Sequence, residues 1–94
     1  MTEYKDTPFP TKSAALAYSG EGAPVLLAKG ENAVAQTIVD IASEHGIPIV
    51  QDDRLTEVLS QIALGEEIPP NLYVAVAEVL AYVYRLNARV DQQA

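Results

Sequence analysis

The chain has 94 residues, of which 49% are hydrophobic, and this size and composition fit one domain with its own core rather than two. It contains no cysteine, which excludes a disulfide framework and any metal site built on thiolates. The formal net charge is −7, and Arg54 is the only basic residue between Glu31 and Glu78. Because so acidic a chain repels phosphate groups, we expect neither nucleic acid nor an anionic membrane surface as a partner.

The first twelve residues, Met1–Lys12, are predicted to form a flexible N-terminal arm. Pro8 and Pro10 oppose regular structure there, and few of the side chains are suited to burial. Charged residues, of which Glu3 is the first, interrupt this segment before the apolar core of a signal peptide can form. No apolar run in the chain reaches the ~18–20 residues that a membrane-spanning helix needs, so we expect no membrane insertion.

Two short apolar runs after the arm predict a β-hairpin. They are Ser13–Ser19 and Pro24–Lys29, and the Gly-containing loop Gly20–Ala23 separates them. The first run is rich in alanine, which has a low strand propensity, so it is the weaker of the two strand signals.

A helix and a further strand are predicted after Gly30. The helix is expected to run to His45, and Gly46 is suited to the left-handed conformation that ends many helices. Its apolar residues recur at i, i+4, i+7 and i+8, which predicts one buried face: Val34, Ile38, Ile41 and Ala42. Ile47–Gln51 is predicted to be a buried strand. Strand, helix and strand in succession predict a right-handed crossover, with this strand parallel to Pro24–Lys29.

Two more helices are predicted in the second half of the chain. Asp52 and Asp53 suit the N-cap and first turn of a short helix that ends at Leu64–Gly65. Its apolar face is formed by four residues: Leu55, Val58, Leu59 and Ile62. Asn71–Leu86 is the most apolar run of the chain, and Pro70 fits the first turn of a helix there. At ~100° per residue, one side of this helix carries its larger apolar residues: Leu72, Val76, Val79, Val83 and Leu86. We expect the rest of the chain to pack around this helix.

Together these elements predict an α/β fold, with a small mixed β-sheet of three to four short strands and three main helices packed on it. The domain is expected to span residues 13–87. It would lie between the flexible arm, 1–12, and a frayed C-terminal tail, 88–94, in which the apolar pattern fades.

Four stretches, taken in order, resemble one known family. They are Ala23–Gly30 (APVLLAKG), Glu44–Val50 (EHGIPIV), Leu64–Pro69 (LGEEIP) and Leu72–Val83. This combination is similar to the cytoplasmic C-terminal domain of the FlhB/YscU family, the export-gate proteins of flagellar and virulence type III secretion. The resemblance implies an α/β domain with a four-stranded sheet. It also implies a bacterial cytoplasmic location, with recruitment to the export gate at the inner membrane.

The chain departs from the family pattern at the position where family members cut themselves. The family motif is Asn-Pro-Thr-His, in which the asparagine side-chain amide attacks its own carbonyl group. An ungapped alignment places Pro8-Phe9-Pro10-Thr11 at the motif, and a gap of one residue places Phe9-Pro10-Thr11-Lys12 there. Neither register contains an asparagine, so we expect no self-cleavage and no other enzymatic activity.

A second departure concerns the membrane domain that precedes this domain in full-length family members. Here the first predicted strand begins only a few residues after Met1. We therefore expect a stand-alone relative of the released C-terminal fragment, which lacks the membrane domain.

The resemblance also implies a hydrophobic patch on which export substrates dock. Carried over by position, the patch consists of Ala23, Pro24, Ala77 and Leu80. The helical spacing of Ala77, Leu80 and Tyr84, at i, i+3 and i+7, adds a flank that can stay exposed. The alternative is that all five are peripheral core residues.

The remaining polar candidates are better explained by structural roles. His45 is the only histidine, and with no second ligand or hydroxyl partner we expect it to be neither catalytic nor metal-binding. Asp52 and Asp53 are explained by helix capping. We expect no cofactor and no metal, and the partners to be export-apparatus proteins or export substrates.

The sequence therefore predicts a non-enzymatic interaction module of protein export that influences substrate specificity. The alternative is a small-molecule-binding or enzymatic α/β domain unrelated to export. That alternative needs convergent polar groups in a pocket.

Overall fold

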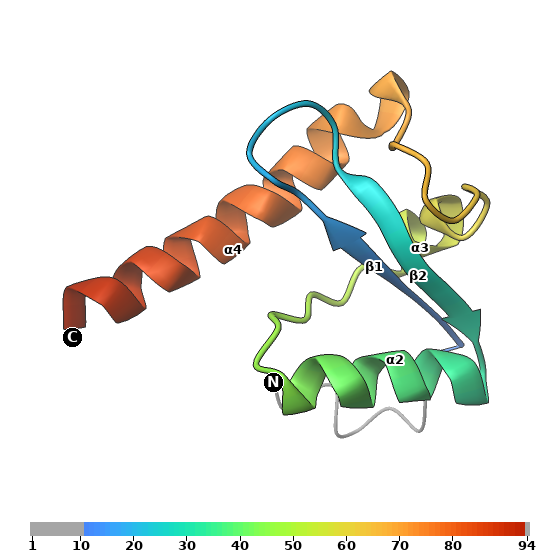
Figure 1. Ribbon diagram of the computed structural model, residues 1–94, viewed down its shortest axis with the longest axis horizontal. Helices are drawn as coiled ribbons and strands as arrows, with labels where there is room; N and C mark the ends of the chain where they lie inside the picture. Colours follow the sequence, from blue (N-terminus) through green and yellow to red (C-terminus); the bar gives the residue numbers. More distant parts are fainter. Residues whose placement is uncertain (1–10, 94) are drawn as a thin grey trace.

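The structure is a computed structural model that describes the backbone of residues 11–93 and the side-chain surroundings up to residue 86. Strands β1 (Lys12–Ala17) and β2 (Val25–Glu31) form an antiparallel hairpin with a bulge at Ala15/Leu16, as predicted (Figure 1). Gly20 and Gly22 in the connecting loop have φ angles of 98° and 70°, which glycine adopts without steric cost.

Helix α2 (Ala33–Glu44) packs on the hairpin and ends at Gly46 in a Schellman motif. The two hydrogen bonds of this motif run from Gly46 N to the Ser43 carbonyl and from Ile47 N to the Ala42 carbonyl, at 3.2 and 2.9 Å. Gly46 has a φ of 69°, so the predicted helix end is confirmed.

The predicted buried face of α2 is wrong at two of its four positions, whereas Ile38 and Ala42 are half-buried. Val34 and Ile41 are 56% and 50% exposed, whereas Ala35 and Val39 are buried. The helix is rotated because its small residue, Ala35, lies against β1, where the Ala35 carbonyl accepts a 3.0 Å hydrogen bond from Ser13 Oγ. The spacing of large apolar residues, on which the prediction is based, does not indicate that a helix approaches a strand closely at an alanine.

The predicted strand Ile47–Gln51 is also wrong, and with it the parallel crossover. This segment connects α2 to α3 without ladder hydrogen bonds, and Ile47 and Ile49 are exposed. Pro48 within it has no N–H to donate, so pairing would gain little. In the described residues the sheet has two strands instead of three or four.

The free edge of β2 is covered by a different segment, which follows Gly65. Leu26 exchanges hydrogen bonds with it: Leu26 N donates to the Glu66 carbonyl and Gly65 N donates to the Leu26 carbonyl, at 2.9 and 2.8 Å. Ile68 N donates to the Pro24 carbonyl at 3.0 Å. The residues after Gly65 therefore act as a short, irregular extension of the sheet, with one isolated bridge to β2.

Helix α3 (Asp53–Leu59) begins as predicted. Asp52 is the N-cap, and its Oδ1 accepts a 3.0 Å hydrogen bond from Leu55 N. Lys29 contacts the turn after the C-terminus of α3, where its ammonium group donates to the carbonyls of Ser60 and Ile62. This contact joins β2 to the turn that follows α3.

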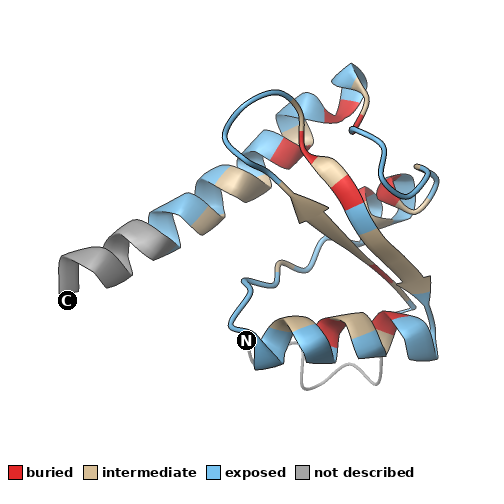
Figure 2. Ribbon diagram, in the orientation of Figure 1, coloured by how far each residue is buried: buried red, intermediate tan, exposed pale blue. Residues whose placement is uncertain are grey.

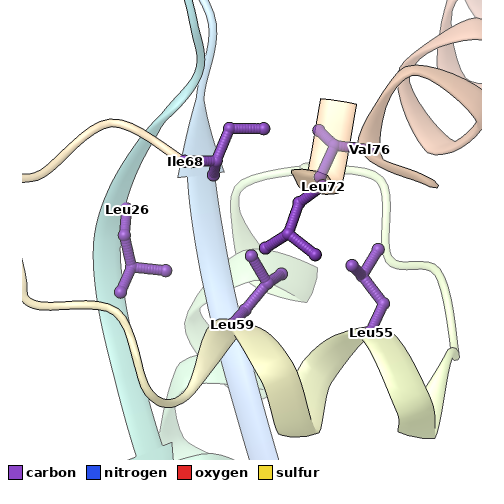
Figure 3. Packing of buried hydrophobic residues seen from close by; sticks show 6 residues of the cluster. All are labelled: Leu26, Leu55, Leu59, Ile68, Leu72 and Val76. Atoms are coloured by element: carbon purple, nitrogen blue, oxygen red, sulfur yellow. The ribbon is translucent and has the colours of Figure 1, made fainter. Parts of the chain in front are cut away.

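The buried core lies between β2, α3 and the start of the last helix, as Figure 3 shows. Its six residues are Leu26, Leu55, Leu59, Ile68, Leu72 and Val76. Leu26 of β2 and Val76 of α4 are the largest fully buried side chains of this core. Burying such a side chain contributes roughly 1.5–3 kcal/mol.

The last helix consists of a 3₁₀ turn, η1 (Pro70–Leu72), and α4 (Tyr73–Gln93). The prediction that the rest of the chain packs around it is wrong. Only its start is buried, and α4 then extends away from the other elements (Figures 1 and 2). Val74 and Tyr84 are each 74% exposed. The two-stranded sheet is too small to cover the remaining turns.

The α/β class and the three main helices are confirmed. The last helix continues to Gln93, past the point at which the apolar pattern of the sequence fades. The proposed division into arm, domain and tail stays a prediction.

Candidate protein-binding groove

An open groove of about 500 Å³ lies between the hairpin loop, the segment before η1, and the first turns of α4. Ten residues line it: Tyr18, Gly22, Ala23, Pro24, Glu67, Ile68, Tyr73, Val76, Ala77 and Leu80. Ile68 and Val76 are buried and belong to the core as well as to the groove. Most of the lining is apolar, so the groove can accept apolar side chains of another polypeptide.

The structure brings four of the five predicted patch residues together in this groove. Ala23 and Pro24 follow the hairpin loop, whereas Ala77 and Leu80 lie one turn apart on α4. Pro24 is buried, Ala23 and Leu80 are half-buried, and Ala77 is exposed. Tyr84 is not among the lining residues and lies further along α4, exposed to solvent.

Two aromatic residues of the groove were missed in the sequence analysis. Tyr18 and Tyr73 are each 47% exposed and line the groove together. Tyr73 precedes Ala77 by one helical turn, so the helical spacing that suggested Tyr84 could also have found Tyr73. No local pattern indicates Tyr18, because its position depends on how the hairpin loop lies against α4.

The groove also contains a carboxylate that the sequence did not single out. Glu67 reaches it because the segment after Gly65 runs beside β2, a pairing that depends on contacts distant in sequence. The Glu67 side chain is exposed, as are those of Glu66 and Glu78.

The polar residues considered as catalytic or metal-binding candidates make contacts that stabilise the fold. His45 is exposed at the end of α2, and its Nδ1 lies 2.9 Å from the Ile41 carbonyl. Asp52 caps α3. Among the described residues, no three His, Asp or Glu side chains gather closely enough to hold a metal ion.

Only Thr11 and Lys12 of the degenerate cleavage motif lie within the described residues. Pro8, Phe9 and Pro10 fall outside the described residues. The Thr11 carbonyl accepts a 2.9 Å hydrogen bond from Asn32 N, at the end of the hairpin opposite the loop. The Lys12 ammonium contacts both carboxylate oxygens of Glu57 on α3 at 2.8 Å, and this hydrogen bond raises the pKa of Lys12 above 10.5.

The described residues form a small α/β domain with an open, mostly apolar groove between the hairpin loop and α4. The family described as FlhB HrpN YscU SpaS matches residues 10–83, and the chain belongs to this family.

Named relatives agree with this assignment. The chain is 46% identical over 72 residues to the flagellar biosynthetic protein FlhB of Aquifex aeolicus (strain VF5). This match covers 73% of this chain and 21% of that protein. The chain is 35% identical over 84 residues to the protein YlqH of Bacillus subtilis (strain 168), which covers 87% of this chain and 90% of YlqH. The chain thus spans about a fifth of the length of this FlhB relative and most of YlqH.

Solved structures share the fold. The crystal structure of the PscU C-terminal domain matches with a TM-score of 0.72 and 29% identity, over 77% of this chain and 95% of that domain. A variant of the EscU C-terminal domain matches with a TM-score of 0.71 and 28% identity. This match covers 78% of this chain and 93% of that domain.

No helix within the described part of the chain has both the length and the apolar character that crossing a bilayer requires.

Proposed function

We propose that this chain is a non-enzymatic interaction module of flagellar or type III protein export. It binds export substrates or components of the export apparatus through the groove between the hairpin loop and α4, and so influences which substrates are exported. It acts in the bacterial cytoplasm, recruited to the export gate at the inner membrane.

The observation that carries this proposal is the meeting of Ala23, Pro24, Ala77 and Leu80 in one open groove. These residues come from distant parts of the chain, and their side chains are small or flexible. Small residues along the wall leave room for the side chains of a partner, while buried Ile68 and Val76 lie beneath the wall and anchor it to the core. A pre-formed apolar surface binds without the entropic cost of ordering it first.

The proposal is tested by a pair of matched substitutions on α4. Ala77→Asp places a carboxylate on the groove wall, whereas Ala81→Asp makes the same change at an exposed position one turn further on that does not line the groove. Both variants are expected to fold, because both alanines are exposed. Ala77→Asp is expected to abolish capture of export-apparatus proteins or substrates by the tagged chain, and Ala81→Asp to leave it unchanged.

The same two variants are then compared in a deletion strain scored for motility and for secretion of filament protein. Failure of Ala77→Asp alone to complement the strain supports the groove as the docking surface. Equal behaviour of both variants, with unchanged thermal stability, would contradict it. Recovery of no export protein, together with a bound metabolite in native mass spectrometry, would favour a small-molecule function.

A further inference from the structure

The groove carries a negative charge on its rim that nothing in the described structure balances. Glu67 lines the groove, is exposed, and has no side-chain hydrogen bond or ion pair among the described residues. Glu21 directly precedes the lining residue Gly22 in the hairpin loop and is also exposed. Glu67 is therefore the carboxylate that the groove presents to a partner.

Two lysines of the domain are engaged outside the groove. Lys29 donates to the carbonyls after α3, and Lys12 is paired with Glu57. No lysine or arginine appears among the residues that line the groove. Because the whole chain also has a formal charge of −7, an incoming cationic group is attracted at long range as well as at the rim.

The two tyrosines add a second feature that favours a cation. Tyr18 and Tyr73 line the same groove as Glu67, and each ring is about half exposed. The faces of aromatic rings attract lysine and arginine side chains, and a nearby carboxylate strengthens the preference. The groove thus combines an apolar floor with a rim suited to a positive charge.

We infer that the groove takes a polypeptide segment in which a lysine or arginine lies beside apolar anchor residues. This inference rests on the proposed function and adds the chemistry of the partner. The apolar side chains of the segment pack on Ala23, Ala77 and Leu80, and its cation is held at the rim by Glu67. A segment with the same anchors and acidic flanks is repelled.

The test uses three synthetic peptides that share the core Leu-Ile-Phe and differ only in their flanks, which are Lys, Gln or Glu on both sides. A fourth peptide has Lys flanks around a serine core and measures general charge attraction. Each is titrated into the isotopically labelled full chain, and the backbone amide shifts of Ala23 and Leu80 report binding at the groove. The Lys-flanked apolar peptide is expected to bind about fivefold more tightly than the Gln-flanked one, the upper range for an exposed ion pair.

Two matched variants separate the rim charge from the net charge. Glu67→Gln removes the carboxylate that lines the groove, and Glu66→Gln removes the adjacent exposed carboxylate that does not. Glu67→Gln is expected to reduce the preference for Lys flanks to less than about twofold, and Glu66→Gln to retain it. Raising the salt from roughly 0.05 to 0.5 M is expected to weaken the preference as well.

The possible failures are distinguishable. If the three apolar peptides bind equally and Glu67→Gln changes nothing, the inference is wrong while the groove remains a docking site. If no apolar peptide shifts Ala23 or Leu80, both the inference and the proposed docking fail. Shifts at these residues that depend on protein concentration alone would show that a second copy of the chain occupies the groove, and would also overturn the inference.

Discussion

The Lys29 ammonium group donates a 2.7 Å hydrogen bond to the carbonyl of Ile62, and so ties β2 to the turn that follows α3. A second bond, of 3.1 Å, goes to the carbonyl of Ser60. Carbonyl groups at a helix end have no partner within the helix, and a cation there also interacts favourably with the helix dipole. Lys29 is half-buried, so water replaces it poorly.

Replacing this lysine should therefore destabilise the domain. Lys29→Met keeps the length and apolar stem of the side chain and removes its charge and donors. We expect it to lower the free energy of unfolding by about 1–3 kcal/mol, measured by urea denaturation, because two carbonyl groups lose a charged donor. Lys12→Met, which breaks an exposed ion pair, is the control and should have a smaller effect. Equal losses for the two variants would argue against a special role for Lys29.

The ion pair between Lys12 and Glu57 gives a prediction about alkaline pH. Hydrogen bonding to Glu57 raises the pKa of Lys12 above its usual 10.5, so the folded state holds this proton more tightly than the unfolded chain does. The associated stability is fully present below pH 10.5 and is lost as the pH rises through the higher, folded-state pKa. In an NMR titration, Lys12 should lose its proton at higher pH than a lysine in an unstructured peptide. Glu57→Gln should remove that difference, and an unchanged titration in this variant would show that Glu57 is not its cause.

Asn32 connects β2 to α2 with a φ of 53° and a ψ of −119°, and its side chain does not cap the helix. This conformation favours glycine. Asn32→Gly relieves steric strain, which outweighs the greater freedom of the unfolded chain, and should raise the free energy of unfolding by about 0.5–1 kcal/mol. Asn32→Ala cannot adopt this conformation easily and should lower it. Thermal unfolding of both variants measures the effect, and a glycine variant less stable than wild type would contradict the prediction.

The absence of an asparagine at the degenerate motif predicts that the chain stays intact. No amide is available at Pro8–Lys12 to attack the backbone carbonyl. After prolonged incubation at neutral pH, intact mass spectrometry should show only the full 94-residue chain. An FlhB domain with a complete Asn-Pro-Thr-His motif, treated in parallel, is the positive control. A spontaneous break beside Pro10 would show that another group performs the reaction.

The features predicted correctly from the sequence are those set by neighbouring residues. The hairpin follows from two apolar runs around a glycine loop, and the ends of two helices follow from Asp52 and Gly46. The failures concern contacts between distant segments. Which face of α2 is buried depends on Ala35 meeting Ser13, and the edge of β2 is taken by the segment after Gly65 instead of Ile47–Gln51.

The residues of the groove also differ in whether the sequence could indicate them. Ala23, Pro24, Ala77 and Leu80 were selected through the family resemblance, and their composition alone would not have distinguished them from core residues. Glu67 reaches the groove only through the irregular pairing beside β2, and Tyr18 only through the placement of the hairpin loop. Residues of this kind become visible when the fold is known.

Ile68 and Val76 serve both the interior of the domain and the bottom of its groove. Both side chains are buried, so a substitution at either position alters the core together with the groove and is expected to lower the free energy of unfolding. Tyr18 and Ala77 line the groove but are exposed, so the shape of the groove can be changed at these two positions at little cost in stability.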